Sequence, residues 1–585
     1  MQLFSVELDG LAGTQNISEE KSEASMTPSC DGFPVLGLEN NAMYLFHPPS
    51  RLHVLAWDSR VGIILLNFVD PTTGSFKTRG WRTSRITVCY DTGVMGSVLA
   101  LDSFKKDFGL PREKGGFTSP QNAQVSSNVV SLLTAGCFFG AIGAAFINDR
   151  YGRRYSLMLF TVIFLIGASI QTGAQAIGHI YAGRVVAGLG IGGMSSITPV
   201  FVSENCPPNV RGRIAGLFQI FLVLGMVFAY WLDYGVALRI PPSTKQWRIP
   251  VAVQIIPGGL LLVGLFFLQE SPRWLTKKNR LDEALKSLAY IRNEATDSPA
   301  IQAEMAEIRA AIDNELALTE GVTWRECLQP GNRQRFLLAF GIMVCQQFSG
   351  TNSIGYYAPQ IFQTVGLSST NASLFATGIY GTVKLLTGSL FLAFGIDRWG
   401  RRKSLIVGAI WMAGMMIIIG AVLAAKPPHV GSGNGTTSSA SIAMVVMIYL
   451  YVIGYSASWG PTPWVYISEI FPNRLREYGV SLGATTQWLF NFVITEITPQ
   501  AVNHIGWRTF LMFGIFCLAN AAFITIFIKE TKGRTLEDMD ILFGLVSEDD
   551  RKADVEHMLQ KGLETQHVEV TNADIELAPR TGGSR

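Results

Sequence analysis

The sequence predicts an all-helical membrane protein made of two related halves, and composition, long apolar runs and an internal repeat support this. Of its 585 residues, 48% are hydrophobic and only 16% are charged, whereas soluble domains average about 25% charged residues. A membrane helix needs about 20 apolar residues, and a barrel strand only about 9–11. Runs of 19 to 22 residues without an acidic or basic side chain occupy 185–203, 214–232, 250–269, 404–425 and 509–528. These runs are too long for barrel strands and favour helices.

Eleven membrane spans follow from the apolar runs, and a twelfth, weak one comes first in the chain. We expect the eleven near 129–147, 155–175, 180–203, 213–232, 250–268, 336–356, 372–396, 404–425, 441–467, 479–499 and 508–528. The weak one lies near 86–103, where only sixteen residues separate Arg85 from Asp102 and one of them is Asp91. That is short of the roughly 20 residues that cross a bilayer.

The chain divides into five segments around these spans. Residues 270–334 are polar and include a helical face formed by Leu281, Leu285, Leu288 and Ile291, so they predict short amphipathic helices between the halves. The expected segments are 1–85, of atypical composition; 86–269, the first membrane half; 270–334, a cytoplasmic bridge; 335–528, the second half; and 529–585, a cytoplasmic tail. We expect the polar residues 544–585 to be disordered.

Basic residues collect on one side of the predicted membrane. They concentrate in 149–154, 210–213, the bridge and 397–403, whereas loops such as 425–441 are poor in them. The positive-inside rule places the basic loops, and with twelve spans both termini, in the cytoplasm.

Motifs of the first half return in the second. Asp149-Arg-Tyr-Gly-Arg-Arg154 returns as Asp397-Arg-Trp-Gly-Arg-Arg402, and Ser203-Glu204 returns as Ser468-Glu469. Glu270 closes the first half much as Glu530 closes the second. Two related halves joined by a bridge indicate a transporter whose substrate site lies between them near the bilayer midplane.

Several other classes of protein are disfavoured. The net charge of +3 is too small to indicate nucleic-acid binding. The seven cysteines are scattered singly, so neither a disulfide nor a metal site is indicated. No nucleophile–base set and no cofactor motif occurs, so we expect neither an enzyme nor a cofactor. The N-terminus lacks the pattern of a cleavable signal peptide.

With these motifs, the chain resembles the sugar porter family of the major facilitator superfamily, in its fungal monosaccharide transporter and quinate permease-like branch. The resemblance runs from about Tyr90 to Phe543. It rests on the paired DRxGRR motifs, ESPRW at 270–274, QQFSGTNSIGYY at 346–357, GPTPW at 460–464 and KETKGRTLE at 529–537. It implies a major facilitator fold, and a monomer that moves a monosaccharide by alternating access, with the plasma membrane as the default location.

The resemblance implies a cytoplasmic gate of arginines and carboxylates. Bidentate pairs on the basic side would latch the two halves together and break when that side opens. The alternative is that the basic loops only set topology. The expected gate residues are Asp149, Arg153, Arg154, Glu204, Glu270, Asp397, Arg401, Arg402, Glu469 and Glu530.

A sugar site needs amides, which can both donate to and accept from hydroxyl groups, and aromatic faces. By resemblance, the cavity is lined by Gln219, Gln346, Gln347, Asn352, Trp464, Gln487, Trp488 and Asn491. The alternative role for the amides is hydrogen bonding between helices.

Asp91 and Arg184 are charges at membrane depth, which are costly and therefore usually pair or line a path. The resemblance implies that they face each other and that Asp91 takes up the transported proton. This favours symport, while the alternatives are facilitated diffusion and an ion pair that only fixes helix packing.

Lys384 interrupts the eighth span, where many neutral-sugar carriers of the family have an amide. A cation in the cavity would suit an anionic substrate such as a uronic acid or quinate, and the segment 244–261 also resembles quinate permeases. QQFSG and GPTPW instead resemble hexose and pentose porters, and a lysine can also snorkel or pair with an acid. A neutral monosaccharide is the first expectation, a sugar acid or quinate the alternative, and a non-transporting nutrient sensor a lesser one.

The N-terminal segment departs from the family. Members carry an apolar run before the YDTG stretch, where this chain has Lys77, Arg79, Arg82 and Arg85. We expect residues 1–85 to reflect a misplaced start or exon boundary in the gene. The alternative is a shortened and impaired first span.

Overall fold

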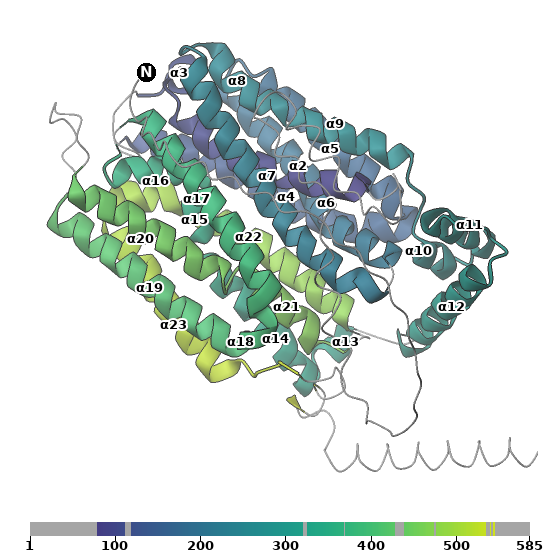
Figure 1. Ribbon diagram of the computed structural model, residues 1–585. Coiled ribbons are helices and arrows are strands. Elements are labelled where there is room, and N and C mark those ends of the chain that lie inside the picture. Colours follow the sequence, from purple (N-terminus) through teal and green to yellow (C-terminus); the bar gives the residue numbers. More distant parts are fainter. Residues whose placement is uncertain are drawn as a thin grey trace, which may run out of the picture. The chain divides into compact units, whose positions relative to one another are not determined.

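A computed structural model describes residues 79–111, 119–206, 208–319, 324–367, 369–427, 438–472, 475–533, 539 and 542–543. Within these ranges the secondary structure is helical (Figure 1). Residues 1–78 of the expected segment 1–85, and most of the expected tail 529–585, lie outside the described residues.

Nine of the described helices are long and apolar enough to cross a membrane. Their outward faces carry large hydrophobic side chains, including Phe146, Phe267 and Ile526, each more than 70% exposed. Exposed apolar surface on this scale indicates contact with lipid. The prediction of a helical membrane protein is therefore confirmed.

The first half contains helices of very different lengths. They are α2 (Arg79–Ala100), α3 (Asp102–Asp107), α4 (Pro120–Tyr151), α5 (Arg153–Thr172), α6 (Ile177–Asn205), α7 (Pro208–Arg239), α8 (Thr244–Val253) and α9 (Ile255–Phe266).

The weak first span differs from its expected bounds. Helix α2 has 22 residues, so its length suffices for a span, although its first part contains the cations of segment 79–85. The helix therefore begins before the expected bound, in polar residues, and among the described helices α2 is not one of those apolar enough to cross a membrane, which agrees with the expected truncation of the apolar span.

Close packing in the first half depends on small residues. At Gly140 of α4 an added Cβ would meet the backbone of Leu189, and at Gly188 of α6 it would meet that of Leu133. Without side chains at these positions, the backbones of α4 and α6 approach closely, as is common in membrane helix pairs.

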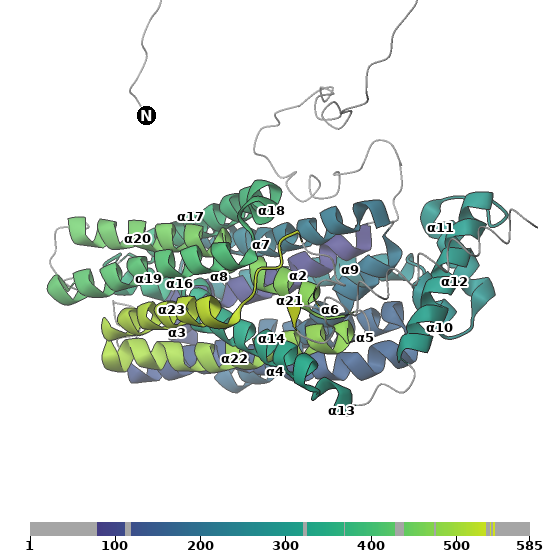
Figure 2. The same cartoon turned by 90° about the horizontal axis from the view of Figure 1, so that it is seen from below.

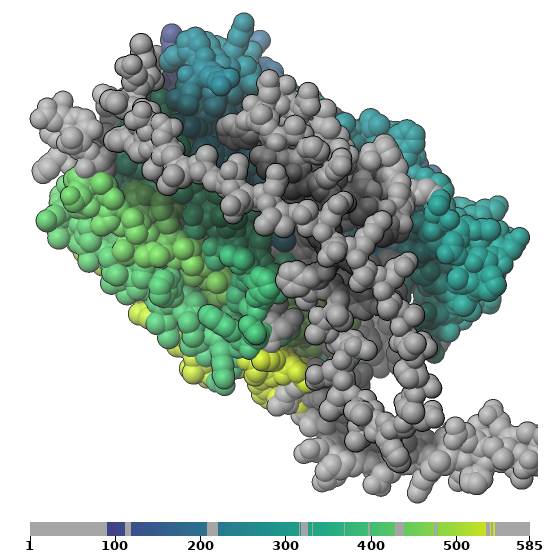
Figure 3. Space-filling view, in the orientation of Figure 1, coloured from purple at the N-terminus to yellow at the C-terminus, as the bar shows by residue number. Residues whose placement is uncertain are grey.

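Four short helices follow in the polar segment. They are α10 (Pro272–Lys277), α11 (Leu281–Arg292), α12 (Pro299–Thr319) and α13 (Trp324–Cys327). Leu288 is buried in a small core with Ile301 and Ile308, which pairs the apolar faces of α11 and α12. Figure 3 shows α11 and α12 as a dark teal lobe, and Arg292 ties them to the end of α6 through the carbonyl of Asn205.

The second half contains more broken helices than expected. They are α14 (Pro330–Phe348), α15 (Thr351–Tyr356), α16 (Ala358–Thr364), α17 (Thr370–Leu390) with a π-helical turn, η2 (Phe391–Gly395), α18 (Ile396–Trp399), α19 (Arg401–Ala425), α20 (Ser439–Ser456), α21 (Thr462–Ile470), α22 (Arg476–Ile505) and α23 (Arg508–Phe527).

Two expected spans therefore need correction. The span at 336–356 runs from Pro330 to Thr364 in three pieces, and it breaks first at Gly350, whose φ is +88°. The span at 441–467 breaks between α20 and α21, at the glycine and prolines of GPTPW. Such breaks free backbone groups near the middle of a membrane protein, where they must find other partners.

The two halves meet along four helix pairs among the described residues. Helix α4 packs along α22 (Figure 2), α7 packs along α17, and α2 contacts α15 and α16. Below, the "basic end" is the end of the helices where Arg153 and Arg401 lie, and the "opposite end" is the other one.

Candidate functional site

A buried ion pair joins three helices of the first half. The Arg184 Nη1 atom on α6 lies 2.9 Å from Asp91 Oδ1 on α2, and the two side chains are 1% and 0% exposed. The Arg184 Nε group also donates to the carbonyl of Val129 on α4 at 2.9 Å. The second carboxylate oxygen of Asp91 accepts no hydrogen bond from the described residues. It is therefore the atom of this pair at which a proton can bind.

Arginine–carboxylate pairs occupy matching places at the basic end of each half. Arg153 binds Glu204 through both Nε, at 3.0 Å, and Nη2, at 2.7 Å. In the second half Arg401 Nη2 lies 2.8 Å from Glu469 Oε1. The expected pairs thus exist, but each lies inside one half and does not join the two. The reason is local: α5 and α19 each begin beside the end of a helix of their own half.

The remaining gate candidates have different partners. The side chains of Arg154 and Arg402 donate to backbone carbonyls near the ends of α9 and α23, at 2.9 and 2.6 Å. Asp149 is exposed and lies 3.4 Å from Lys278 on the bridge. The side chain of Asp397 lies outside the described residues.

Glu270 and Glu530 cap the starts of two equivalent helices. Glu270 accepts hydrogen bonds from the backbone N–H groups of Arg153 and Arg154, at 2.9 and 3.0 Å. Glu530 accepts the corresponding bonds at the start of α19, at 2.9 and 3.1 Å. A carboxylate at a helix N-terminus satisfies free N–H groups and complements the helix dipole.

The glycine of each DRxGRR motif makes room for this cap. Gly152 has φ +92° and Gly400 has φ +78°, a region that glycine adopts without steric cost. A Cβ at Gly400 would lie 2.8 Å from the Oε2 atom of Glu530, and one at Gly152 would meet Glu270 in the same way. The motif is therefore a structural signature of the capped helix.

The two caps differ electrostatically. Burial raises the pKa of Glu270, and the backbone N–H groups offset only part of this effect. At Glu530 burial acts in the same direction, but four backbone N–H groups outweigh it and hold the pKa below its usual value. On acidification the first-half cap therefore loses its charge before the second-half cap.

The amides of QQFSGTN lie buried between broken helices. The Gln346 Nε2 group donates to the carbonyl of Trp459 at 2.8 Å and reaches that of Gly460 at 3.3 Å, two carbonyls freed by the break between α20 and α21. Its Oε1 atom accepts no hydrogen bond within the described part of the chain. Gln347 accepts a hydrogen bond from Asn352 at 2.6 Å. These amides therefore hold the broken helices together, and the Gln346 Oε1 atom remains available as an acceptor.

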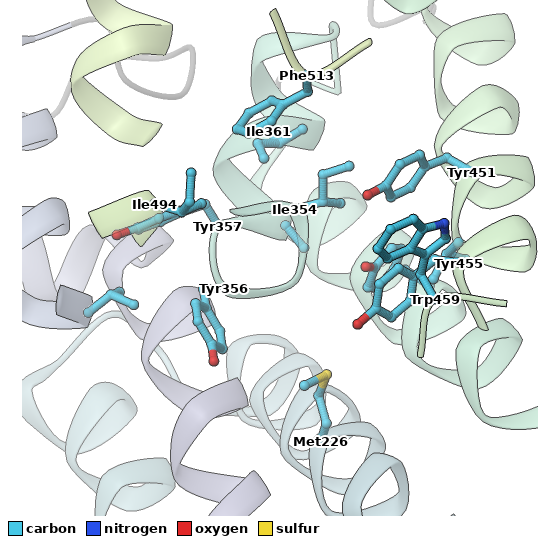
Figure 4. Packing of buried hydrophobic residues seen from close by; sticks show 14 of the residues in the cluster. Met226, Ile354, Tyr356, Tyr357, Ile361, Tyr451, Tyr455, Trp459, Ile494 and Phe513 are labelled. Carbon is cyan, nitrogen blue, oxygen red and sulfur yellow. The ribbon is translucent and has the colours of Figure 1, made fainter. Parts of the chain in front are cut away.

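Helix α22 supplies further predicted residues. Asn491 donates to the hydroxyl group of Tyr356 at 3.0 Å. Gln487 is half-buried, and Trp488 packs against the core of the first half. Trp464, on α21, is also half-buried and packs against a core to which both halves contribute. Figure 4 shows the buried residues around this site, with Tyr356 and Tyr357 on one side and Tyr451, Tyr455 and Trp459 on the other.

A cavity between the halves contains Lys384. It is lined by Ile220 and Val223 of α7 and, from the second half, by residues of α17 and the α20–α21 break, including Tyr455 and Gly460. The Lys384 Nζ atom lies 5.6 Å from the centroid of the Tyr455 ring, a cation–π distance. Gly460 links this cavity to Gln346. Gln219 precedes Ile220 on α7, and its side chain lies outside the described residues.

Hydrogen bonds between the halves converge toward the opposite end, and one of them involves an acid that the sequence analysis missed. The Ser131 hydroxyl group on α4 donates to Glu496 Oε2 on α22 at 2.5 Å, and Ser127 donates to the Glu496 carbonyl at 3.0 Å. The Tyr357 hydroxyl group of the second half reaches the carbonyl of Ser126 on α4 at 3.4 Å. A hydrogen bond to an ionised carboxylate is about twice as strong as a neutral one. The sequence could have identified this acid, because Glu496 is the one ionisable residue in the otherwise uncharged run 479–499.

Helix α7 makes the second set of these bonds and carries a second acid that was missed. The Tyr230 hydroxyl group donates to the carbonyl of Gly355 at 2.6 Å, and Trp231 Nε1 donates to Thr382 at 3.1 Å. Asp233, one turn beyond Tyr230, is fully buried. In the sequence it follows the apolar run 214–232 directly, where an acid is easily taken for the end of a span.

The model of the family described as sugar (and other) transporter matches residues 83–543. The chain belongs to this family. It is a family of transporters, not of enzymes, so the chain is a multi-pass membrane transporter. The resemblance inferred from the motifs is thereby confirmed.

Fungal relatives are similar over most of the chain. A "probable quinate permease" of Aspergillus clavatus is 38% identical over 464 residues, which cover 78% of this chain and 84% of the relative. A quinate permease of Neurospora africana is 38% identical over 467 residues, which cover 78% and 86% of the two chains.

Solved structures confirm the major facilitator fold. The xylose transporter XylE of E. coli, in a partially occluded inward-open conformation, matches with a TM-score of 0.64 at 24% identity, over 78% of this chain and 98% of XylE. The structure titled as the proton:xylose symporter XylE bound to 6-bromo-6-deoxy-D-glucose matches with a TM-score of 0.61 at 26% identity, over 79% and 98% of the two chains.

Proposed function

We propose that this transporter moves a monosaccharide-sized, polyhydroxylated solute together with protons by alternating access. The observation that carries the proposal is the buried pair of Asp91 and Arg184, in a chain of this family. One oxygen of Asp91 is paired and the other is open to a proton, so the carboxylate can exchange its arginine for a proton when the helices move. A proton:xylose symporter is among the proteins that the chain resembles.

The hydrogen bonds at the opposite end support the alternating step. Ser131–Glu496 and Tyr230–Gly355 join the halves there, whereas the arginine–carboxylate pairs of the basic end lie within each half. In our proposal this structure is the form closed at the opposite end, and the basic end faces the cytoplasm. The gate residues named above exchange partners across the halves when the basic end closes. The protein acts as a monomer in the plasma membrane.

The solute lies between the halves, in contact with both amides and aromatic rings. Gln346, with its open acceptor, and Asn491 face the broken helices from which Tyr356 and Trp459 also come. Amides match sugar hydroxyl groups in both directions, and aromatic faces cover the C–H surface of a ring. This arrangement supports the predicted substrate-binding residues as a group.

Uptake of labelled D-xylose and D-glucose into a transporter-null yeast tests the proposal, at mildly acidic and at neutral external pH. Wild type is expected to accumulate the sugar at acidic pH. Asp91→Asn is expected to lose accumulation but to keep exchange of internal for external sugar, because exchange needs no net proton movement. Asp102→Asn, at an exposed position of α3, is the matched control. Undiminished accumulation by Asp91→Asn would refute the coupling role.

A sugar acid or quinate is the second candidate substrate, and Lys384 favours it. Lys384 is buried, with 8% of the residue exposed, and lines a cavity between the halves, where its ammonium group could pair with a carboxylate of the solute. The fungal relatives reported above bear the names quinate permease and "probable quinate permease". Truncating one partner of a buried charge pair costs about 2–5 kcal/mol, which corresponds to a loss of affinity of about 30-fold or more.

Competition assays separate the two candidates. Quinate and galacturonate should inhibit uptake of labelled sugar, and Lys384→Gln should weaken this inhibition about 30-fold or more while sugar uptake persists. Lys426→Gln, at the exposed end of α19, is the control. Sugar uptake that neither acid inhibits would leave the neutral monosaccharide as the substrate.

A further inference from the structure

Asp233 is a membrane-embedded acid with no role in the site described so far. It is 0% exposed, and neither of its carboxyl oxygens accepts a hydrogen bond from the described residues. The Ser97 hydroxyl group on α2, also 0% exposed, faces the carboxyl group but lies outside hydrogen-bonding geometry. Ionised carboxylates in such surroundings are strongly disfavoured. The simplest species that fits this burial is the neutral carboxylic acid.

The charges on neighbouring helices do not compensate this acid. Among the described residues, no side chain on these helices donates a hydrogen bond to either of its carboxyl oxygens. The ionisable residues on the helices packed against α7 are Tyr90 and Asp91 on α2, His179, Tyr181, Arg184 and Glu204 on α6, Lys245 and Arg248 on α8, and Tyr380 and Lys384 on α17, besides Arg79, Arg82, Arg85 and Cys89 at the start of α2, whose side chains lie outside the described residues. Among them, Arg184 forms a salt bridge with Asp91, and Arg248 donates a hydrogen bond to the carbonyl of Ala174.

The other half of the molecule covers this acid. One turn before Asp233, Tyr230 donates to the carbonyl of Gly355. One residue before Ser97, Gly96 lies directly against the backbone carbonyl of Tyr356. Both contacts are made by the end of α15, so separating the halves at the opposite end would uncover the Asp233–Ser97 region. Asp233 is then the buried acid that opening exposes to solution.

Asp233 also lies between Asp91 and the opposite end. Its neighbour Ser97 is six residues beyond Asp91 on α2, which is roughly 9 Å along a helix axis at about 1.5 Å per residue. The register of the two helices agrees with this, because a Cβ at Gly93 of α2 would lie 3.3 Å from the Cβ of Ala229 on α7, and Ser97 and Asp233 each lie one turn further along. Asp91 itself is 0% exposed, so it needs a group that brings protons to it.

We propose that Asp233 is a proton-entry site, which binds a proton from solution at the opposite end and passes it to Asp91. The Asp233 carboxylic acid gives up its proton and becomes a carboxylate, and the open oxygen of Asp91 accepts that proton. When the opposite end reopens, a proton from solution restores the acid. One proton moves per cycle, as in the proposed function on which this inference rests, and Asp233 sets the rate of its delivery.

Proteoliposomes with the full chain test this, using labelled D-xylose and, in parallel, labelled quinate. Asp233→Asn should slow proton-driven uptake several-fold, leave exchange unchanged, and leave the final solute gradient unchanged because Asp91 still couples one proton. A small weak acid such as hydrazoic acid, added as azide, should restore the rate by carrying protons to Asp91. Asp233→Glu should stay close to wild type, and Asp102→Asn is the control.

Each other outcome overturns the inference. Unchanged uptake by Asp233→Asn would remove the entry role, and a parallel fall in exchange without azide rescue would make Asp233 structural. A smaller final gradient would make Asp233 a carried-proton site and not an entry site. If Asp233→Asn does not fold, Ser97→Ala decides, because the inference expects it to slow uptake and to respond to azide: an unchanged uptake rate without any azide effect in Ser97→Ala would overturn the inference. If wild type moves no proton with either solute, the proposed function itself fails.

Discussion

Gly96 allows a direct test of how the halves close. It lies on α2 against the backbone carbonyl of Tyr356 in the other half, so close that an added Cβ would overlap the carbonyl oxygen. Because the obstacle is backbone, Gly96→Ala can be accommodated only if the halves move apart. Overpacking of this kind costs about 1–3 kcal/mol. The form closed at the opposite end should therefore lose population roughly 5- to 150-fold relative to the open form.

Thiol labelling measures this shift. Ser127 is fully buried beneath Glu496, so Ser127→Cys should react slowly with a membrane-impermeant maleimide, read out at this residue by mass spectrometry. Adding Gly96→Ala should speed the reaction roughly 5- to 150-fold. Gly235→Ala, on α7, is the control, because its Cβ would meet nothing within 4 Å. Equal labelling rates in the two alanine variants would refute the reasoning.

Three further predictions concern single groups. Glu496→Gln should speed labelling of Ser127→Cys, because the bond from Ser131 becomes a neutral one, and neutral bonds contribute about 0.5–1.5 kcal/mol where bonds to charged groups contribute about 1.5–3 kcal/mol. Gly152→Ala should lower the thermal unfolding midpoint in detergent, because alanine is strained at φ +92° and its Cβ displaces the Glu270 cap. Glu530→Gln should destabilise the protein at neutral pH more than Glu270→Gln does. The folded protein lowers the pKa of Glu530 below the value near 4.5 of the unfolded chain, so ionised Glu530 stabilises the fold above that pH, and this stabilisation is lost as the pH falls through the folded pKa. The folded protein raises the pKa of Glu270, so ionisation of Glu270 opposes folding at neutral pH.

Each of these has an outcome that contradicts it. Labelling in Glu496→Gln at the rate of its parent would show that the Ser131 bond does not hold the halves. Gly178→Ala, where a Cβ meets nothing within 4 Å, controls for the Gly152 variant, and equal midpoints would exclude the cap. Equal effects of the two glutamine substitutions at neutral pH would contradict the electrostatic difference between the caps.

The sequence predicts most of the fold because hydropathy and repetition are properties of the chain itself. The apolar runs fix the number and order of the spans, and the paired motifs fix the relation of the halves. The pairing of Asp91 with Arg184 was expected from the family resemblance, and the structure places the two side chains 2.9 Å apart. The bounds of α2 were missed because a helix can begin in polar residues before its apolar run.

Other features depend on three-dimensional neighbours that a sequence does not specify. The break at Gly350 and the role of Gln346 in holding the carbonyls of Trp459 and Gly460 follow from tertiary packing. The sequence could not tell whether the arginines pair with carboxylates of their own half or of the other half, because the spacing of the motifs along the chain is compatible with both. Asp233 is adjacent to an apolar run and looks like its polar end, and only its burial shows that it lies inside the protein.

The most direct test of the account is whether solute and proton move together. Purified protein in liposomes with an internal pH dye should acidify the lumen when external D-xylose, D-glucose, galacturonate or quinate is added, without an imposed gradient. The account predicts acidification with at least one of these solutes in wild type, and none in Asp91→Asn. Entry of a labelled solute without any change in internal pH would contradict it.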